Sequence, residues 1–203
     1  MIEGQDPDGA TPLGPDEKSG LMHPHVATKA ELNELENANI LQGLAWLNSL
    51  PKVTTDVVLS RDFVIELHKR MFGDTWLWAG VYRQREMNIG CDPLQVGPNL
   101  HNLIEDIKCW IEFDHYPSLE VSARIQHRLV LIHPFANGNG RHSRIFTDCI
   151  RHFSLGLPPL VWAAGNLDQQ NEERKNYIRG LQQADAGDYE PFIEYLRDKG
   201  NTK

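Results

Sequence analysis

The residues whose types and spacing could support chemistry are concentrated in one short segment, from His133 to Arg144. Gly138 and Gly140 allow backbone conformations and close approaches that other residues prevent, and they stand just before a predicted helix. The N–H groups and the dipole at a helix N-terminus favour bound anions. Arg141 and Arg144 lie on one face of that helix, where two guanidinium groups could hold more than one phosphate. We therefore predict a phosphate-binding site in this segment.

His133 is the candidate catalytic group of the same segment. Pro134 disfavours the helical conformation at the residue before it, so the preceding helix should end at His133. A neutral imidazole in that place could take a proton from an attacking hydroxyl. The alternative is that the two Asn-Gly pairs between residues 137 and 140 are ordinary tight turns and that His133 is structural. The segment is neither a Walker phosphate loop nor a Rossmann fingerprint.

Helical periodicity accounts for most of the chain and supplies the supports for this segment. Thr28 and Glu31 have the spacing of a capping box, so the first long helix should span residues 28–49. Apolar residues recur at helical spacing in further segments, which we predict to be helices: 60–72, 99–116, 118–132, 169–186 and 189–199. Another helix should follow the loop at residues 133–140 and end at Gly156.

Glycine and proline interrupt the helical pattern between residues 80 and 98. Within that range, residues 81–83 and 87–89 could extend, which favours a small β-hairpin. Two short helices are expected just before it, around Trp76 and Trp78. The pattern as a whole predicts a mainly α protein with a small β element.

Composition limits the class of protein. The 203 residues are 40% hydrophobic with a formal net charge of -8, as is ordinary for one soluble globular domain. The acidic balance argues against a nucleic-acid polymer as partner, but it leaves room for one nucleotide in a basic pocket. Neither a signal peptide nor a membrane span is evident, and the three cysteines lack paired spacing, so we expect a cytoplasmic protein. Residues 1–27 should form an irregular N-terminal arm, and residues 28–203 a single helical domain.

The segment at 133–144, HPFANGNGRHSR, resembles the signature HPFx(D/E)GNGRxxR of the Fic (Fic/Doc) proteins. The resemblance extends over most of the chain. Residues 78–83 are similar to the family's segment ahead of its substrate-docking flap, and residues 185–192 to its carboxy-terminal helix junction. The arm and the first helix, with Glu36-Asn37-Ala38-Asn39-Ile40, resemble the branch called mobile mystery protein B.

The resemblance implies a Fic fold, which is a helical bundle with a small β-hairpin flap. It also implies a protein adenylyltransferase that moves AMP from ATP to a Ser, Thr or Tyr hydroxyl, with His133 as general base and Phe135 as packing anchor. The flap, at Met87, Asn88 and Ile89, would lay the backbone of the target beside the loop as an added strand. The residues implied to bind the nucleotide are Asn137, Gly138, Asn139, Gly140, Arg141, Arg144 and, for adenine, Tyr177.

Asn137 departs from the family signature, which has Asp or Glu at this position as a magnesium ligand. An amide offers one neutral oxygen, whereas Mg²⁺ prefers charged oxygen ligands. We therefore expect Mg²⁺ to bind weakly at Asn137 or to be held by the phosphates alone. Three outcomes stay open: slow AMP transfer, transfer of a different group, or nucleotide binding without turnover.

Many Fic proteins are silenced by a helix with the motif (S/T)xxxE(G/N). Glu36-Asn37 matches the end of this motif, while Leu32 replaces its Ser or Thr. The resemblance therefore implies that residues 28–49 are an inhibitory helix and that Glu36 acts on Arg144. A solvated charged face is the alternative interpretation of these acidic residues.

Competing functions follow from the same resemblance. A Doc-type phosphotransferase would move a phosphate in place of AMP, and a nucleotide-binding module would have little catalysis. The expected partners are ATP, a target protein with a hydroxyl side chain and a small antitoxin-like protein, with no nucleic-acid polymer and no membrane.

Overall fold

Thr28 begins the first long helix of the computed structural model, which describes residues 12, 14–51, 53–162, 167 and 171–200. Its side chain accepts a hydrogen bond from the N–H of Glu31, and the Glu31 carboxylate accepts one from the N–H of Thr28. This reciprocal capping satisfies N–H groups that a helix start leaves unpaired. The predicted capping box is confirmed, and α2 spans Lys29–Ser49.

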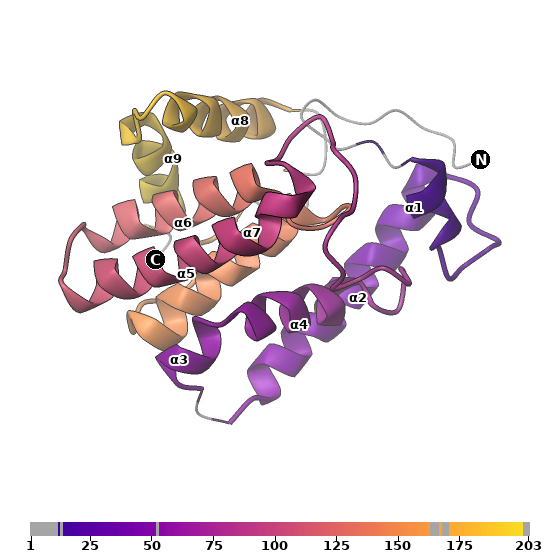
Figure 1. The fold of residues 1–203 in the computed structure, drawn as a ribbon, viewed down its shortest axis with the longest axis horizontal. Coiled ribbons are helices and arrows are strands. Elements are labelled where there is room, and N and C mark those ends of the chain that lie inside the picture. Colours follow the sequence, from indigo (N-terminus) through magenta and orange to yellow (C-terminus); the bar gives the residue numbers. More distant parts are fainter. Residues whose placement is uncertain (1–11, 13, 52, 163–166, 168–170, 201–203) are drawn as a thin grey trace.

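The described part of the chain is a bundle of helices joined by short connections (Figure 1). The longer elements are α2 (Lys29–Ser49), α4 (Arg61–Phe72), α5 (Val96–Glu112), α6 (Ser118–Ile132), α7 (Asn139–Cys149), α8 (Glu172–Asp185) and α9 (Glu190–Gly200). Short elements are α1 (Pro15–Ser19), α3 (Thr55–Val58), the 3-10 turn Pro93–Gln95 and the π-helical turn Ile150–Ser154. The predicted mainly α class is confirmed.

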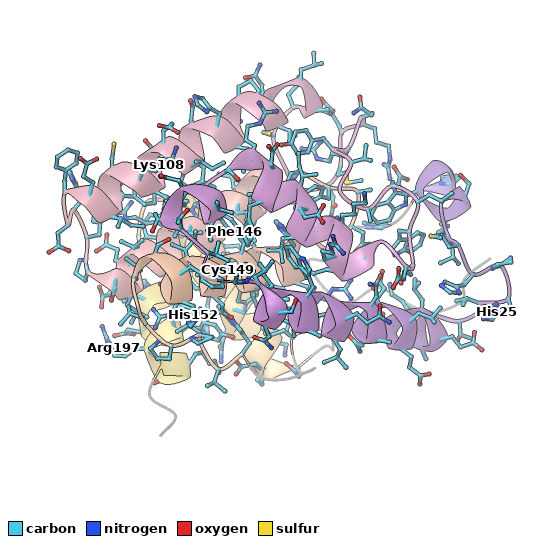
Figure 2. The ribbon with its side chains drawn as sticks, turned by 90° about the horizontal axis from the view of Figure 1, so that it is seen from below. His25, Lys108, Phe146, Cys149, His152 and Arg197 are labelled. Carbon is cyan, nitrogen blue, oxygen red and sulfur yellow. The ribbon has the colours of Figure 1, made fainter. Side chains whose placement is uncertain are left out.

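Two clusters of buried side chains hold the helices together. In the larger cluster, which includes Leu67, Phe72 and Phe146, α2 lies along α4, α4 contacts α5 and α7, and α6 contacts the same two helices. Figure 2 shows Phe146 and Cys149 in the centre of the helical body, while His25 lies at its edge. The smaller cluster joins α6 to α8 and α9. None of the described helices combines the length and apolar character needed to cross a membrane.

Several element boundaries differ from the predictions. The helix predicted at 99–116 begins at Val96 and ends at Glu112, because a 3-10 turn leads directly into it and its first turn tolerates Pro98. Part of the expected irregular arm is helical, since residues 15–19 form α1 with Pro15 at its start. The short helices predicted around Trp76 and Trp78 were wrong, because these residues form turns that place both indole rings against the bundle.

The described residues between 80 and 98 do not form the predicted β-hairpin. Tyr82 makes an isolated antiparallel bridge with Phe135, so this part of the chain pairs with the connection between α6 and α7 and not with itself. The guanidinium of Arg83 binds the carbonyl oxygens of Arg85 and Cys91. A side chain therefore occupies acceptors that a hairpin ladder would use, and the segment 84–92 has no regular structure.

Candidate active site

His133 ends α6 in the left-handed conformation, with φ 52° and ψ 62°. Pro134 blocks helix continuation, as the sequence predicted, and the left-handed residue turns the chain away from the helix axis. The segment from His133 to Gly138, called the His133 loop below, connects α6 to α7. Its backbone is fixed by Asn139, whose side chain accepts from the N–H of Phe135 at 2.9 Å and donates to its carbonyl at 2.8 Å.

The imidazole of His133 is only 6% exposed, and burial lowers its pKa from 6.5 to about 4. The ring is therefore neutral at pH 7. Its Nδ1 lies 3.2 Å from the carbonyl oxygen of Val130, an acceptor, so Nδ1 carries the proton and Nε2 keeps its lone pair. This tautomer is the one that a general base needs.

Gly138 makes the turn from the His133 loop into α7. Its φ of 76° is left-handed, and a Cβ atom there would lie 2.6 Å from the ring of Phe72. Both the conformation and the contact require glycine. At Gly140, by comparison, an added Cβ would meet only the Arg144 guanidinium, at 3.7 Å.

His68, on α4, supports the His133 loop from below. The Gly80 N–H donates to its Nδ1 at 3.0 Å, so Nε2 carries the proton and donates to the carbonyl oxygen of Asn137, also at 3.0 Å. Its ring stacks on Phe135 with centroids 3.7 Å apart. Complete burial holds the pKa of His68 well below its usual range, so this ring is a neutral bridge. In the sequence His68 is only a histidine on an apolar helix face, so this contact was not predicted.

Arg141 and Arg144 lie on the first turns of α7, as predicted. Arg141 forms an ion pair with the buried carboxylate of Glu36, with Nη2 and Oε2 2.8 Å apart. Its guanidinium also lies over the ring of Phe72, 5.0 Å from the centroid. We expected Glu36 to act on Arg144, whereas among the described residues its carboxylate pairs with Arg141, one turn earlier on α7.

Glu36 has a second partner, which the sequence did not indicate. The indole Nε1 of Trp76 donates to Glu36 Oε1 at 2.7 Å, and both side chains are buried. Because each carboxylate oxygen has a donor, the orientation of Glu36 toward α7 is fixed. The alternative of a solvated charged face does not fit a glutamate that is 3% exposed.

Tyr177 lies on α8 and is 6% exposed. Its hydroxyl accepts a hydrogen bond from Gln126 at 2.8 Å, and its ring packs against Phe192 and Tyr195. The guanidinium of Arg144 lies 5.8 Å from the centroid of the Tyr177 ring. These contacts indicate that Tyr177 supports Arg144 and do not favour the adenine contact that the resemblance implied.

Lys29, at the start of α2, adds positive charge near this site. Its pKa is lowered by burial first and by the neighbouring charges of Arg141 and Arg174, while Glu36 raises it. Four residues from three helices therefore share one electrostatic environment around the start of α7. Sequence reasoning missed Lys29 and Arg174, because nothing in their local pattern distinguishes them from surface charges.

The predicted flap residues Met87, Asn88 and Ile89 lie in the irregular segment 84–92, called the flap segment below, which lies next to the His133 loop. Gly90, which follows them, approaches so closely that an added Cβ would lie 2.8 Å from the Cβ of His133. Asn88 is exposed, and Met87 and Ile89 are partly buried. The structure thus brings the flap segment to the histidine without forming a hairpin.

The side-chain oxygen of Asn137 is turned back toward the backbone of the His133 loop. Its Oδ1 accepts from the N–H of Gly138 at 2.5 Å. Among the described residues, no group of three or more His, Cys, Asp and Glu side chains could hold a metal ion. The neutral, already engaged amide oxygen of Asn137 suits Mg²⁺ less well than the carboxylate of the family signature would.

Comparison with known proteins agrees with this geometry. Residues 58–150, which run from α3 to the end of α7, match the sequence profile described as the Fic/DOC family. This range contains the His133 loop and the helices on both sides of it, while Glu36 and Tyr177 lie outside it. Residues 58–150 of this chain therefore form a Fic/DOC domain.

Relatives and solved structures show how far the likeness extends. A protein adenylyltransferase Fic of Drosophila virilis is 29% identical over 140 residues, which are 66% of this chain and 27% of that protein. The same-named protein of Nematostella vectensis is 28% identical over 177 residues, 84% of this chain and 39% of that protein. The chain thus spans well under half the length of these relatives.

The solved structure of C. elegans Fic-1 is 26% identical, with a TM-score of 0.65, and covers 90% of this chain and 52% of that one. BepC of Bartonella tribocorum, solved with bound AMPPNP, shares the fold at 18% identity and a TM-score of 0.64, covering 100% of this chain and 99% of that one.

Proposed function

We propose that this protein transfers AMP from ATP to a hydroxyl group of a protein side chain. The observation that carries the proposal is the neutral His133 imidazole, protonated on Nδ1, at one end of a loop whose other end starts a helix bearing Arg141 and Arg144. The names of the relatives, protein adenylyltransferases, support the same activity.

Each group has a defined part in the reaction. The phosphates of ATP lie at the N-terminus of α7, where backbone N–H groups, Arg141 and Arg144 balance their charge. His133 Nε2 takes the proton of the target hydroxyl as its oxygen attacks the α-phosphorus. The bond between the α-phosphorus and the bridging oxygen breaks, and pyrophosphate leaves with that oxygen. The product is a phosphodiester between AMP and the side chain.

The target chain adds to the flap segment at Met87, Asn88 and Ile89. Backbone pairing of this kind gives affinity with little dependence on sequence, so a hydroxyl on the added chain reaches His133. The proximity of Gly90 to His133 supports this placement. The small antitoxin-like partner and the cytoplasmic location stay predictions.

Magnesium would be bound mainly by the phosphates of the nucleotide. ATP in cells carries Mg²⁺ on its phosphates, and Asn137 adds at most one neutral oxygen. A bound metal would neutralise charge on the leaving pyrophosphate, and the α7 residues of the protein align the phosphates.

The Glu36–Arg141 ion pair restrains this activity. A carboxylate on Arg141 competes with the phosphates for the same guanidinium, so ATP must displace it or bind in a less productive position. Glu36→Gly removes the carboxylate, and the rate of auto-modification is expected to rise.

Labelled ATP tests the proposal. The Glu36→Gly protein is incubated with Mg²⁺ and ATP carrying the label either on the α- or on the γ-phosphate, and mass spectrometry follows the added mass. AMP transfer retains the α-label only, whereas a Doc-type phosphotransfer retains the γ-label only and contradicts the proposal.

His133→Ala provides the matched control. It is expected to abolish labelling while leaving ATP binding by calorimetry within about twofold, because the phosphate contacts lie on α7. ATP binding without any labelling in the Glu36→Gly protein favours the nucleotide-binding module, which the replacement at Asn137 makes the relevant alternative.

A further inference from the structure

Arg83 is a buried arginine that joins the flap segment to the end of α6. The residue is 4% exposed. The N–H groups of its guanidinium donate to carbonyl oxygens on two separate stretches of chain. On α6 and the His133 loop, Nε donates to His133 at 2.6 Å and Nη2 to Ile132 at 3.4 Å. On the flap segment, Nη1 donates to Arg85 at 2.9 Å and Nη2 donates to Cys91.

Two of these acceptors lie at the C-terminus of α6, and the other two lie in the irregular segment 84–92. The last carbonyls of a helix lack intrahelical donors, and those of Ile132 and His133 are of this kind. The Arg83 backbone N–H adds a further bond to the carbonyl of Pro134 at 2.9 Å. Arg83 thus provides the cap at the C-terminus of α6 from a distant part of the sequence.

The cap stabilises His133, which has an unfavourable backbone conformation. A left-handed conformation is unfavourable for a residue with a side chain, and His133 adopts it with φ 52°. The bond from Arg83 Nε to the His133 carbonyl holds the following peptide in one orientation. That orientation in turn sets the direction of the imidazole, whose Nδ1 must reach Val130.

The flap segment lies directly against the same pair. A Cβ atom at Gly90 would lie 2.5 Å from Arg83 Nη2 and 2.8 Å from His133 Cβ, and Gly90 has φ 122°. A shift of the segment between Arg85 and Cys91 toward α6 therefore presses on Arg83 or on His133. A rigid fork of N–H groups transmits such a shift, whereas the donors of a lysine sit on one freely rotating ammonium group.

We propose that Arg83 is the positioning residue that couples the target-binding flap to the general base. When a target chain seats on residues 87–89, the fixed carbonyls of Arg85 and Cys91 keep Arg83, and through it His133, in the reactive geometry. The proposal rests on the proposed AMP transfer. It names a residue that sets the rate of that reaction without contacting either substrate.

Arg83→Lys in the Glu36→Gly background tests the coupling. Lysine keeps the charge, but its three N–H donors radiate from one atom and cannot reach all four carbonyls, so the base loses its fixed direction. We expect kcat for AMP transfer to fall by about tenfold to a hundredfold, as a misplacement of about 1 Å produces. The KM for ATP should stay within about twofold, because the nucleotide contacts lie on α7.

Arg151→Lys is the matched control. Arg151 is also a buried arginine bound to a backbone carbonyl, that of Pro158 at 3.0 Å, but it lies in the π-helical turn beyond the far end of α7. If the two variants lose thermal stability to a similar extent and only Arg83→Lys loses kcat, the positioning role is supported. Equal kcat for the two variants overturns it.

A second measurement is independent of turnover. Nitrogen-detected NMR of the histidine rings reports the tautomer, and the parent protein should show His133 with its proton on Nδ1 alone. In Arg83→Lys we expect a mixture of the two tautomers, and an unchanged single tautomer overturns the proposal. If the Glu36→Gly protein transfers no AMP, the proposed function fails, and this NMR comparison still decides whether Arg83 orients His133.

Discussion

At the level of single residues, Asn137 carries the main chemical departure from the family signature. Its amide oxygen is engaged by the neighbouring N–H of Gly138, and it has no negative charge to offer a metal. His133, by contrast, is kept neutral by its surroundings, because burial and, to a smaller extent, the charge of Arg83 lower its pKa. These two residues give separate predictions, one about the metal and one about pH.

Asn137→Asp, made in the Glu36→Gly background, should lower the Mg²⁺ concentration for half-maximal AMP transfer. One added carboxylate oxygen in reach of the phosphates is expected to improve metal binding by about tenfold, which is about 1.4 kcal/mol. Reaction rates measured against Mg²⁺ concentration give the value. Asn102→Asp adds the same charge on the exposed surface of α5 and serves as control. A shift of the same size in both variants would contradict a metal role for position 137.

The pH profile of kcat/KM should report the low pKa of His133. A base with a pKa of about 4 is almost entirely unprotonated at pH 5.5, so the rate there should exceed about nine-tenths of its value at pH 7.5. A histidine with an ordinary pKa would leave about one-tenth. A relative kcat/KM near one-tenth at pH 5.5 would contradict the assignment of His133 as a buried base.

A folding control must accompany this measurement. Unfolded histidines regain a pKa near 6.5, so the unfolded state binds more protons than the folded state between about pH 6.5 and 4. The stability due to neutral His133 and His142 is complete above pH 6.5 and is lost as the pH falls toward 4. Circular dichroism should therefore establish that the protein is folded at pH 5.5.

At the level of elements, the loop between α6 and α7 depends on contacts from other helices. Phe72 and His68 on α4 lie beneath it, and Asn139 closes it from within. The turn at Gly138 is the point where this support is closest, so a side chain there should disturb the start of α7.

Gly138→Ala should lower the free energy of unfolding by more than Gly187→Ala does. Both glycines have left-handed φ, 76° and 88°, but an added Cβ at Gly187 meets nothing within 4 Å. The left-handed strain, about 1–2 kcal/mol, is common to both, and the collision with Phe72 adds about 1–3 kcal/mol at Gly138 only. Urea unfolding measures both values. Losses of equal size would mean that α4 yields to the added methyl group.

At the level of the whole molecule, the N-terminal arm reaches the two parts that control the site. Leu21 forms an antiparallel bridge with Trp76, the residue that holds Glu36. Glu17 forms an ion pair with Arg85 of the flap segment, and this contact lowers the pKa of the Glu17 carboxyl. Figure 1 shows α1 beside the N-terminal end of α2, on the side of the molecule away from α9.

Gly20→Ala should raise AMP transfer in the otherwise unchanged protein by several-fold, on the order of threefold to tenfold. A Cβ at Gly20 would lie 2.6 Å from Trp78 Cδ1, and Trp78 stacks on Trp76 at 4.9 Å, so the arm must shift where it supports the Glu36 contact. The same substitution in the Glu36→Gly background should have no further effect. An increase of the same factor in both backgrounds would show that the arm acts by another route.

Helix positions and the loop chemistry follow from local sequence. The Thr28–Glu31 capping box, the Ser60 cap and Pro134 after His133 each act within a few residues, so the predicted starts of α2 and α4 and the end of α6 were correct. The division into an arm and one domain stays a prediction. The hairpin prediction was wrong because extended residues need a pairing partner, and Tyr82 pairs with Phe135, more than fifty positions away in the sequence.

The sequence alone determined that a histidine, two arginines and a glycine turn meet between two helices, because neighbours in the chain are neighbours in space at that scale. Only the tertiary structure decided which arginine faces Glu36, that Trp76 holds this glutamate, and that Arg83 caps the helix carrying His133. These contacts join residues far apart in sequence, and packing between helices, which leaves no local pattern, selects them.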